Sequence, residues 1–345
     1  MDSSPIRILT VLEAHSITGP TKAVLEFHRE SLCSKTTPRI ELSVLTFLRG
    51  DENAFTRAIR AEDIPLDIVP ENGRFDFSVI PQLRNVVQRR QPDIIWTNAV
   101  KSHFLIRASG LHKSAKWVAF HHGYTTTHWS TRLYNHLDRW SHFGANRLIT
   151  VCEPFARQLA SRGIPRHRIH VEHMPIRISA PVPRNEAAAL RQQLAIAPDT
   201  QILLTVGRLS KEKGHAELLR ALAIIRTTEP NLPVCLVLVG DGPEAANLKA
   251  LCAQLDLQEL VIFAGHQTDL RPFYAFADVF VLPSHSEGSP NVLLEAIDAN
   301  LPIVATTAGG IPEMVTTELN ALLTPPMDVE ALAGSILRML KDKPL

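Results

Sequence analysis

The sequence predicts an α/β protein built from two parallel, doubly wound, Rossmann-like sheets. Short apolar, β-branched runs alternate with longer amphipathic stretches, which is typical of repeated βα units with helices on both sheet faces. The 345 residues exceed the usual size of one hydrophobic core, so we expect two domains. Three prolines within residues 174–183 indicate an extended linker. The predicted boundaries are 1–175 for the first domain, 176–184 for the linker and 185–345 for the second.

The apolar runs place twelve strands along the chain. In the first half they are residues 6–12, 40–47, 66–69, 93–96, 117–120, 147–151 and 168–171, with helices between them, for example at 22–33, 78–90 and 153–162. In the second half the strands are 201–206, 233–239, 260–263, 278–282 and 302–305, and the helices are 214–227, 243–255, 290–299 and 329–340. Ligands bind outside the carboxyl ends of such strands. We therefore expect the two sheets to face each other across a ligand-binding cleft.

Composition favours a globular protein without a membrane span. Hydrophobic residues make up 45% and charged residues 21%. No run of about 18 apolar residues occurs, and the first residues lack the pattern of a secretory signal. We expect a cytoplasmic protein, which could still rest on a membrane surface.

The net charge of +1 is unevenly distributed. Residues 1–172 carry 23 Lys/Arg against 16 Asp/Glu (+7), and residues 173–345 carry 13 against 19 (−6). The basic half could attract an anionic membrane or a phosphate-bearing acceptor, or it could simply be a solvated face. We expect no nucleic-acid partner.

The spacing of the cysteines and histidines in the sequence does not form a metal-binding motif. The four cysteines show no CxxC spacing, so buried free thiols are favoured over disulfides. His167, His170 and His173 cluster at a predicted strand edge without a carboxylate motif, and we interpret them as surface residues. No metal is expected.

Two carboxylates, Glu287 and Glu295, lie eight positions apart in the segment EGSPNVLLE, after the predicted strand 278–282. Ser289 is predicted to cap the next helix and Pro290 to occupy its first turn, because proline lacks the N–H that would be unpaired there. Glu287 would then lie in a loop and Glu295 more than one turn into the helix. The pair suits a hydroxyl-rich ligand such as a nucleotide sugar, although two surface glutamates fit the pattern equally well.

The segment Gly207–Gly214, GRLSKEKG, follows the first strand of the second half and opens a helix. A helix amino end with Arg208 and Lys213 beside it suits a diphosphate, because the helix end carries partial positive charge. The Arg208 guanidinium can bind two phosphate oxygens at once, and the Lys213 ammonium adds a compact positive charge. The alternative is a polar turn with solvated cations.

Further glycine-rich turns follow other predicted strands. Gly240, Asp241 and Gly242 begin a GxGxxA pattern, but it follows the second strand of its domain and lacks the acidic residue expected about twenty positions on. We therefore favour a tight turn near a nucleotide over a nicotinamide site. Gly309 and Gly310 would let backbone N–H groups approach a phosphate or sugar.

In the first half, two turns offer similar chemistry. Gly19 follows the first strand and could face the diphosphate. His122, in the run HHG after the strand 117–120, could hydrogen-bond a sugar or acceptor hydroxyl. A single histidine is also often structural.

The motifs GRLSKEKG, VGDGPE, FAG, ADVFVLPSHSEGSPNVLLEA and PIVATTAGGIPE, in this order, closely resemble the family-4 retaining glycosyltransferases of GT-B fold. The first half matches more loosely, through Gly19, residues 93–98 and HHG. The resemblance implies a transferase that moves a sugar from a nucleotide diphosphate sugar to a glycan or lipid-linked acceptor, in polysaccharide or lipopolysaccharide assembly. A non-catalytic nucleotide-sugar binder and a GT-B epimerase remain alternatives.

The resemblance also implies residue roles. Arg208 and Lys213 would hold the diphosphate, with Gly207, Gly240, Asp241 and Gly242 around the donor. Glu287 would bind the sugar hydroxyls, Glu295 the ribose diol, Gly309 and Gly310 the sugar and phosphates, and His122 the sugar and acceptor. The chain has no DxD triplet, which agrees with the metal-independent habit of these enzymes.

Two features depart from the family pattern. The first-half loop reads Thr-Gly-Pro where many relatives have paired glycines, and the chain stops where relatives usually continue into a helix that crosses back to the first domain. A truncated or naturally short chain would be less secure in its interdomain packing and activity.

Overall fold

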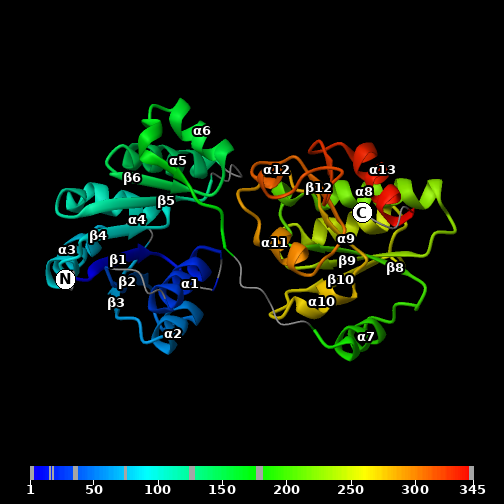
Figure 1. The fold of residues 1–345 in the computed structure, drawn as a ribbon, viewed down its shortest axis with the longest axis horizontal. Coiled ribbons are helices and arrows are strands. Elements are labelled where there is room, and N and C mark those ends of the chain that lie inside the picture. Colours follow the sequence, from blue (N-terminus) through cyan, green and yellow to red (C-terminus); the bar gives the residue numbers. More distant parts are fainter. Residues whose placement is uncertain are drawn as a thin grey trace. The chain divides into compact units, whose positions relative to one another are not determined.

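The computed structural model describes residues 4–14, 17, 19–33, 38–73, 76–123, 129–175 and 182–341, with the backbone alone for 129–135 and 184. The chain divides into two compact units, Met1–His173 and Met174–Leu345. Each unit contains one parallel sheet (Figure 1). This confirms the predicted fold class.

The first unit has a seven-stranded sheet in the order β3-β2-β1-β4-β5-β6-β7. Its strands are β1 (Ile6–Leu12), β2 (Ile40–Leu48), β3 (Leu66–Pro70), β4 (Ile94–Thr97), β5 (Lys116–His121), β6 (Arg147–Thr150) and β7 (Ile169–Val171). Its α-helices are α1 (Gly19–Cys33), α2 (Ala54–Ala61), α3 (Val79–Arg90), α4 (Val100–Ala108), α5 (Trp129–His142) and α6 (Glu153–Ser161). β1 pairs in parallel with both β2 and β4, so the order reverses beside β1.

One face of this sheet is covered by α3, α4 and α6. Leu83 of α3, Ile106 of α4 and Leu159 of α6 share a buried cluster with Leu9 of β1 and Trp117 of β5. Burial of such side chains supplies most of the driving force for this packing. α4 also packs against α5.

The second unit has six parallel strands in the order β10-β9-β8-β11-β12-β13. They are β8 (Gln201–Val206), β9 (Val234–Val239), β10 (Val261–Gly265), β11 (Val279–Leu282), β12 (Ile303–Thr306) and β13 (Leu322–Thr324). The α-helices are α7 (Arg184–Gln193), α8 (His215–Thr228), α9 (Ala245–Gln254), α10 (Arg271–Phe276), α11 (Asn291–Asp298), α12 (Ile311–Met314) and α13 (Val329–Lys341). The order reverses between β8 and β11.

Both faces of the second sheet are buried. Leu203 packs with Leu218 of α8 on one face, while its neighbour Leu204 packs with Leu293 of α11 on the other. Successive side chains of a strand point to opposite faces. The helices after β8 and β11 therefore leave the sheet on opposite sides.

All twelve predicted strands are present within two residues of their predicted ends. The short β13 was not predicted, and α1 begins at Gly19, three residues before the predicted start. A short strand and a helix that opens with Gly-Pro both give weak local patterns.

The predicted cap of α11 is wrong. Pro290 stands at the N-cap position and the helix begins at Asn291. Ser289 instead accepts a hydrogen bond from the Met174 backbone N–H at 3.3 Å, because a nonlocal partner competes for its hydroxyl. Most of the predicted linker, residues 176–181, lies outside the described residues.

Other compositional predictions can be checked residue by residue. Cys152, Cys235 and Cys252 are buried free thiols, whereas Cys33 is exposed. The histidines at 167, 170 and 173 are exposed, as predicted. Among the described residues, no helix is both long and apolar enough to cross a membrane.

Candidate functional site

The candidate site lies at the carboxyl ends of β8 and β11, the adjacent strands where the order of the second sheet reverses. Their helices, α8 and α11, pack on opposite faces, so the two loops that lead to them diverge. Such a switch point leaves a crevice at the sheet edge, where open α/β sheets bind ligands.

Lys213 and Glu287 join these two loops. The Lys213 ammonium Nζ donates to Glu287 Oε1 at 2.6 Å. The Glu287 side chain is 7% exposed and that of Lys213 is 24% exposed. The ion pair is therefore partly desolvated, which makes its attraction stronger than that of a fully solvated surface pair.

Ser284 orients the Glu287 carboxylate. The fully buried Ser284 hydroxyl donates to the same oxygen, Oε1, at 2.7 Å. The Ser284 carbonyl accepts from the Thr306 hydroxyl at 2.5 Å, which ties the loop to the end of β12. Two donors on one oxygen leave the second oxygen, Oε2, available to accept from a ligand hydroxyl.

Gly309 allows the loop after β12 to approach Glu287. A Cβ on Gly309 would lie 1.7 Å from the Glu287 carbonyl oxygen, and the residue has φ +54°. Gly310 donates its backbone N–H to the same carbonyl at 3.4 Å. Only glycine fits at position 309 without moving backbone, so these glycines hold Glu287 in place by packing.

The turn after β9 packs against the loop after β8. A Cβ on Gly240 would lie 1.9 Å from the Gly207 carbonyl oxygen, and one on Gly242 would lie 2.4 Å from that of Leu209. The Asp241 carbonyl accepts from the Leu209 N–H at 3.0 Å. A larger residue at position 240 or 242 would therefore clash with the backbone of the loop after β8. The part of Gly240 and Gly242 in donor binding stays a prediction.

Arg208 and His215 flank the same loop. The Arg208 side chain is exposed, while its backbone carbonyl accepts from the His215 ring nitrogen Nε2 at 3.3 Å. Burial lowers the pKa of His215 to about 4. A neutral His215 therefore anchors the loop that carries Arg208 and Lys213.

Glu295 lies in α11 beside a buried tyrosine. The Tyr274 hydroxyl donates to Glu295 Oε2 at 2.9 Å. Burial, and then the neighbouring carboxylate, raise the pKa of Tyr274, so it remains a donor. The Tyr274 hydroxyl fixes one Glu295 oxygen and leaves the other, Oε1, to accept from a further group.

In the first unit, Gly19 and His122 follow β1 and β5. Among the described residues, a Cβ on Gly19 would have no heavy atom within 4 Å, and the part of Gly19 in donor binding stays a prediction. The His122 ring stacks on Phe120 with centroids 4.5 Å apart, and burial lowers its pKa to about 4. His122 is therefore neutral near pH 7 and can both donate and accept.

Two family models cover most of the chain. Residues 186–345 match glycosyl transferases group 1, and residues 32–173 match a glycosyl transferase 4-like domain. The chain belongs to the family-4 glycosyltransferases of GT-B fold.

Individual relatives agree with this family assignment. The lipopolysaccharide core biosynthesis glycosyltransferase LpsE of Rhizobium meliloti is 35% identical over 45% of this chain and 44% of its own length. EpsF of Bacillus subtilis is 28% identical over 93% of this chain and 83% of its own length. The first curated relatives are matched over only 40%, 42% and 44% of their length.

A solved structure confirms the GT-B fold. HepE of Anabaena, crystallised with UDP-glucose, superposes with a TM-score of 0.81 at 21% identity, covering 98% of this chain and 90% of that chain. At this identity the likeness establishes the fold alone.

Within this GT-B fold, sequence reasoning missed Ser284 and Tyr274. Ser284 lies within the motif ADVFVLPSHSEGSPNVLLEA, two residues after the end of β11, and its position could have drawn attention to it. Tyr274 is 21 residues from Glu295, and no local pattern connects the two.

Proposed function

We propose that this chain is a retaining glycosyltransferase that moves a sugar from a nucleotide diphosphate sugar to a glycan or lipid-linked acceptor. We further propose a role in cell-surface polysaccharide or lipopolysaccharide assembly, since LpsE bears a lipopolysaccharide core biosynthesis name. The observation that carries the proposal is the Lys213–Glu287 pair at the β8/β11 switch point. It places a cation, which can bind a diphosphate, beside a carboxylate, which can accept hydrogen bonds from sugar hydroxyls.

Lys213 and Arg208 are proposed to bind the diphosphate. The ammonium of Lys213 has three donors, of which the Glu287 contact uses one. Arg208 adds an exposed guanidinium that can pair with phosphate oxygens in a fork. Together they would neutralise the leaving group without a metal ion.

Glu287 and Glu295 are proposed to bind the two hydroxyl-rich parts of the donor. Ser284 and Lys213 both contact one oxygen of Glu287, so the other can accept from the transferred sugar. Tyr274 holds one oxygen of Glu295, so the other can accept from the ribose diol. Carboxylates with preset orientations bind hydroxyls at a lower entropy cost.

The proposed chemistry retains the anomeric configuration. The bond between the anomeric carbon and the diphosphate oxygen breaks while the acceptor oxygen bonds to the same face of that carbon. The acceptor hydroxyl proton passes to the leaving phosphate. Negative charge grows on the diphosphate, so Arg208 and Lys213 would contribute mainly by electrostatic stabilisation, and His122 would orient a hydroxyl of the sugar or acceptor.

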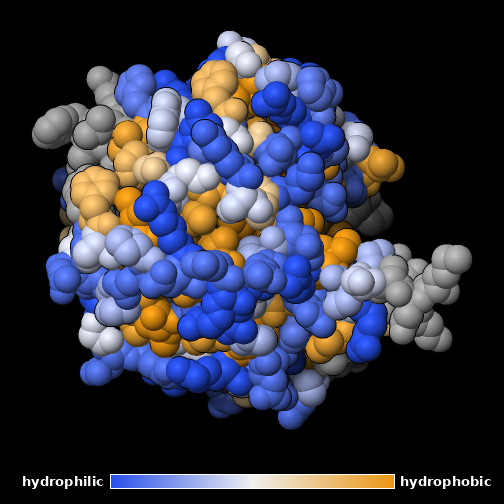
Figure 2. Space-filling view, turned by 90° about the vertical axis from the view of Figure 1, so that its left-hand side faces the viewer, coloured by the Kyte–Doolittle hydropathy of each residue, from blue (hydrophilic) through white to orange (hydrophobic). Residues whose placement is uncertain are grey.

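The first unit is proposed to bind the acceptor, at an anionic membrane surface when the acceptor is lipid-linked. Residues 1–172 carry a net charge of +7. Phe77 and Trp140 are 58% and 47% exposed, Phe104 packs against both, and Arg107 lies over the Trp140 ring. Figure 2 shows apolar residues among hydrophilic ones on the side of the molecule that it draws. Exposed aromatics beside cations suit a headgroup region.

A panel of UDP-, GDP- and ADP-sugars tests this function. Thermal shift reports donor binding, and nucleotide release with a broad set of glycan and lipid-linked acceptors reports transfer. We expect one nucleotide class to raise the Tm and to be consumed only with an acceptor, giving a product that retains the donor's anomeric configuration. Binding without transfer, or isomerisation of the sugar without an acceptor, would contradict the proposal.

A further inference from the structure

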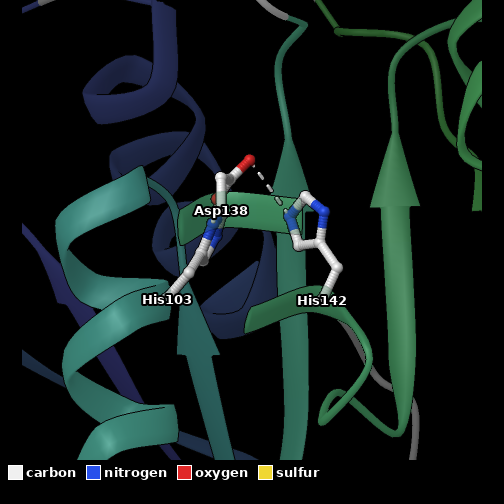
Figure 3. Close-up of side chains that lie close together, drawn as sticks. All are labelled: His103, Asp138 and His142. Atoms are coloured by element: carbon white, nitrogen blue, oxygen red, sulfur yellow. Dashed lines mark hydrogen bonds and ion pairs between the residues drawn. The ribbon is translucent and has the colours of Figure 1, made fainter. Parts of the chain in front are cut away.

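A second group of polar residues is buried in the first unit and includes none of the residues assigned to the donor. His103 of α4 and Asp138 and His142 of α5 point toward one another (Figure 3). Their relative exposures are 2%, 2% and 1%. One ligand atom from each lies within 4.8 Å of the others.

The Asp138 carboxylate is the centre of this group. Its Oδ1 lies 2.6 Å from His103 Nδ1, and its Oδ2 lies 3.4 Å from His142 Nε2. His121, the last residue of β5, reaches the same Oδ2 with Nδ1 at 3.8 Å. Asp138 and His142 are four residues apart on one helix, which brings their side chains to the same face.

The ring of His103 lies between two acceptors. Nδ1 contacts the Asp138 carboxylate, and Nε2 lies 3.3 Å from the Thr97 backbone carbonyl. Both partners only accept, and an imidazole with one N–H can donate to only one of them. If an ion takes Nδ1, the N–H on Nε2 is left to donate to the Thr97 carbonyl. A histidine that binds a metal ion through one nitrogen characteristically donates its other N–H to a carbonyl or carboxylate.

His142 is buried although neither of its ring nitrogens is hydrogen-bonded to a described residue. Its Nε2 faces Asp138. A buried polar group without a hydrogen bond destabilises the folded chain unless something satisfies it. Such groups in native proteins often indicate a water or an ion.

We propose that His103, Asp138 and His142 bind a first-row divalent cation, with Zn²⁺ as the best match. Imidazole and carboxylate ligands suit Zn²⁺. The ion would use His103 Nδ1, His142 Nε2 and an Asp138 oxygen. Water or His121 would complete a tetrahedral shell.

The spacing of the ligand atoms fits this geometry. A tetrahedral ion with ligands about 2.0–2.1 Å away holds them roughly 3.3 Å apart. His142 Nε2 lies 3.4 Å from Asp138 Oδ2. His103 Nδ1 lies 2.6 Å from the other oxygen, Oδ1, and an ion held between them would need this contact to open by roughly 0.7 Å. Rotation about the side-chain bonds of His103 and Asp138 can supply this change.

The site would be structural. Its ligands join α4 to α5, and His121 places it beneath the end of β5, one residue before His122. An ion bound only by the folded protein raises stability by mass action. Zn²⁺ should therefore stabilise the first unit, and it takes no part in the proposed chemistry on the donor.

Metal binding to the full chain tests the proposal. The protein would be stripped with a chelator, dialysed against Zn²⁺ and assayed for bound metal and Tm. We expect one tightly bound Zn²⁺ per chain and a higher Tm. Co²⁺ should give the intense visible absorption of a tetrahedral site. A chain that stays metal-free at micromolar Zn²⁺ would overturn the proposal.

Variants locate the bound ion. His142→Gln and Asp138→Asn should weaken Zn²⁺ binding by at least about 100-fold, while His170→Gln, at an exposed histidine, should bind as the wild type does. Equal binding by His142→Gln and wild type, or loss in His170→Gln, would contradict the assignment. If the buried variants fail to fold, X-ray absorption of the Zn²⁺-loaded wild type decides: two imidazoles and a carboxylate support the site, and a water-rich octahedral shell refutes it.

Discussion

Lys213 Nζ lies 2.6 Å from Glu287 Oε1 and so joins the loop after β8 to the loop after β11. Because both side chains are largely buried, removing one partner leaves the other without its counter-charge. We expect Lys213→Met and Glu287→Gln each to lower the free energy of unfolding, with a coupling energy of about 1–3 kcal/mol in the double-mutant cycle. Urea unfolding measures it. Additive effects would show that the pair is not formed in solution.

Gly309→Ala should destabilise the second unit. The new Cβ would lie 1.7 Å from the Glu287 carbonyl oxygen at φ +54°, so backbone must move, at a cost of about 2–4 kcal/mol. Gly334→Ala is the matched control, because a Cβ there meets nothing within 4 Å inside α13. It should be neutral or stabilising by about 0.5–1 kcal/mol. Equal Tm values for the two variants would refute the packing argument.

We expect the buried His215 to lower the free energy of unfolding in mild acid. Burial holds its pKa at about 4 in the folded chain, below the ordinary value of about 6.5 in the unfolded chain. The unfolded chain therefore binds the proton first as the pH falls. The resulting penalty is absent above about pH 6.5, reaches roughly 2 kcal/mol at pH 5 and grows until about pH 4.

Urea unfolding of His215→Gln at pH 7 and pH 5 checks this effect. Glutamine can still donate to the Arg208 carbonyl but does not titrate. The variant should lose roughly 2 kcal/mol less than the wild type between the two pH values. Identical losses in both proteins would show that His215 does not titrate as described.

Tyr274→Phe should weaken donor binding more than it slows transfer. The substitution removes the hydroxyl that holds Glu295 Oε2 but keeps the ring in its buried place. We expect KM for the donor to rise about 3- to 20-fold, with kcat changed much less, because ribose contacts act equally in ground and transition states. A fall in kcat at unchanged KM would contradict the ribose role of Glu295.

The strands and the loops that carry Lys213 and Glu287 could be predicted from the sequence because their signals are local. β11 is an uninterrupted apolar run and β8 is apolar except for Gln201 and Thr205, so the polar segments after them are easily recognised. The sheet order then brings the loops together, since β8 and β11 pair. The Lys213–Glu287 contact spans 74 residues, yet both partners had been predicted.

Other features could not be predicted, because they depend on which side chains meet in the folded chain. The hydroxyl of Ser289 bonds to Met174 rather than capping α11. His103 and Asp138 are 35 residues apart and lie in helices that the sequence pattern did not define. Gly240 and Gly242 fit a nucleotide motif, but their close contacts are with backbone. Local patterns carry no information on such nonlocal contacts.

Turnover by Arg208→Ala and Lys213→Ala tests whether these two cations stabilise the leaving diphosphate. Lys211→Ala is the control, because Lys211 is an exposed lysine of the same loop. Nucleotide release would be measured with the donor found in the panel, under conditions where chemistry limits the rate. We expect kcat to fall by about 10²–10³ in the first two variants, with the fold intact, and to stay near the wild-type value in Lys211→Ala. Wild-type turnover in Arg208→Ala or Lys213→Ala would contradict it.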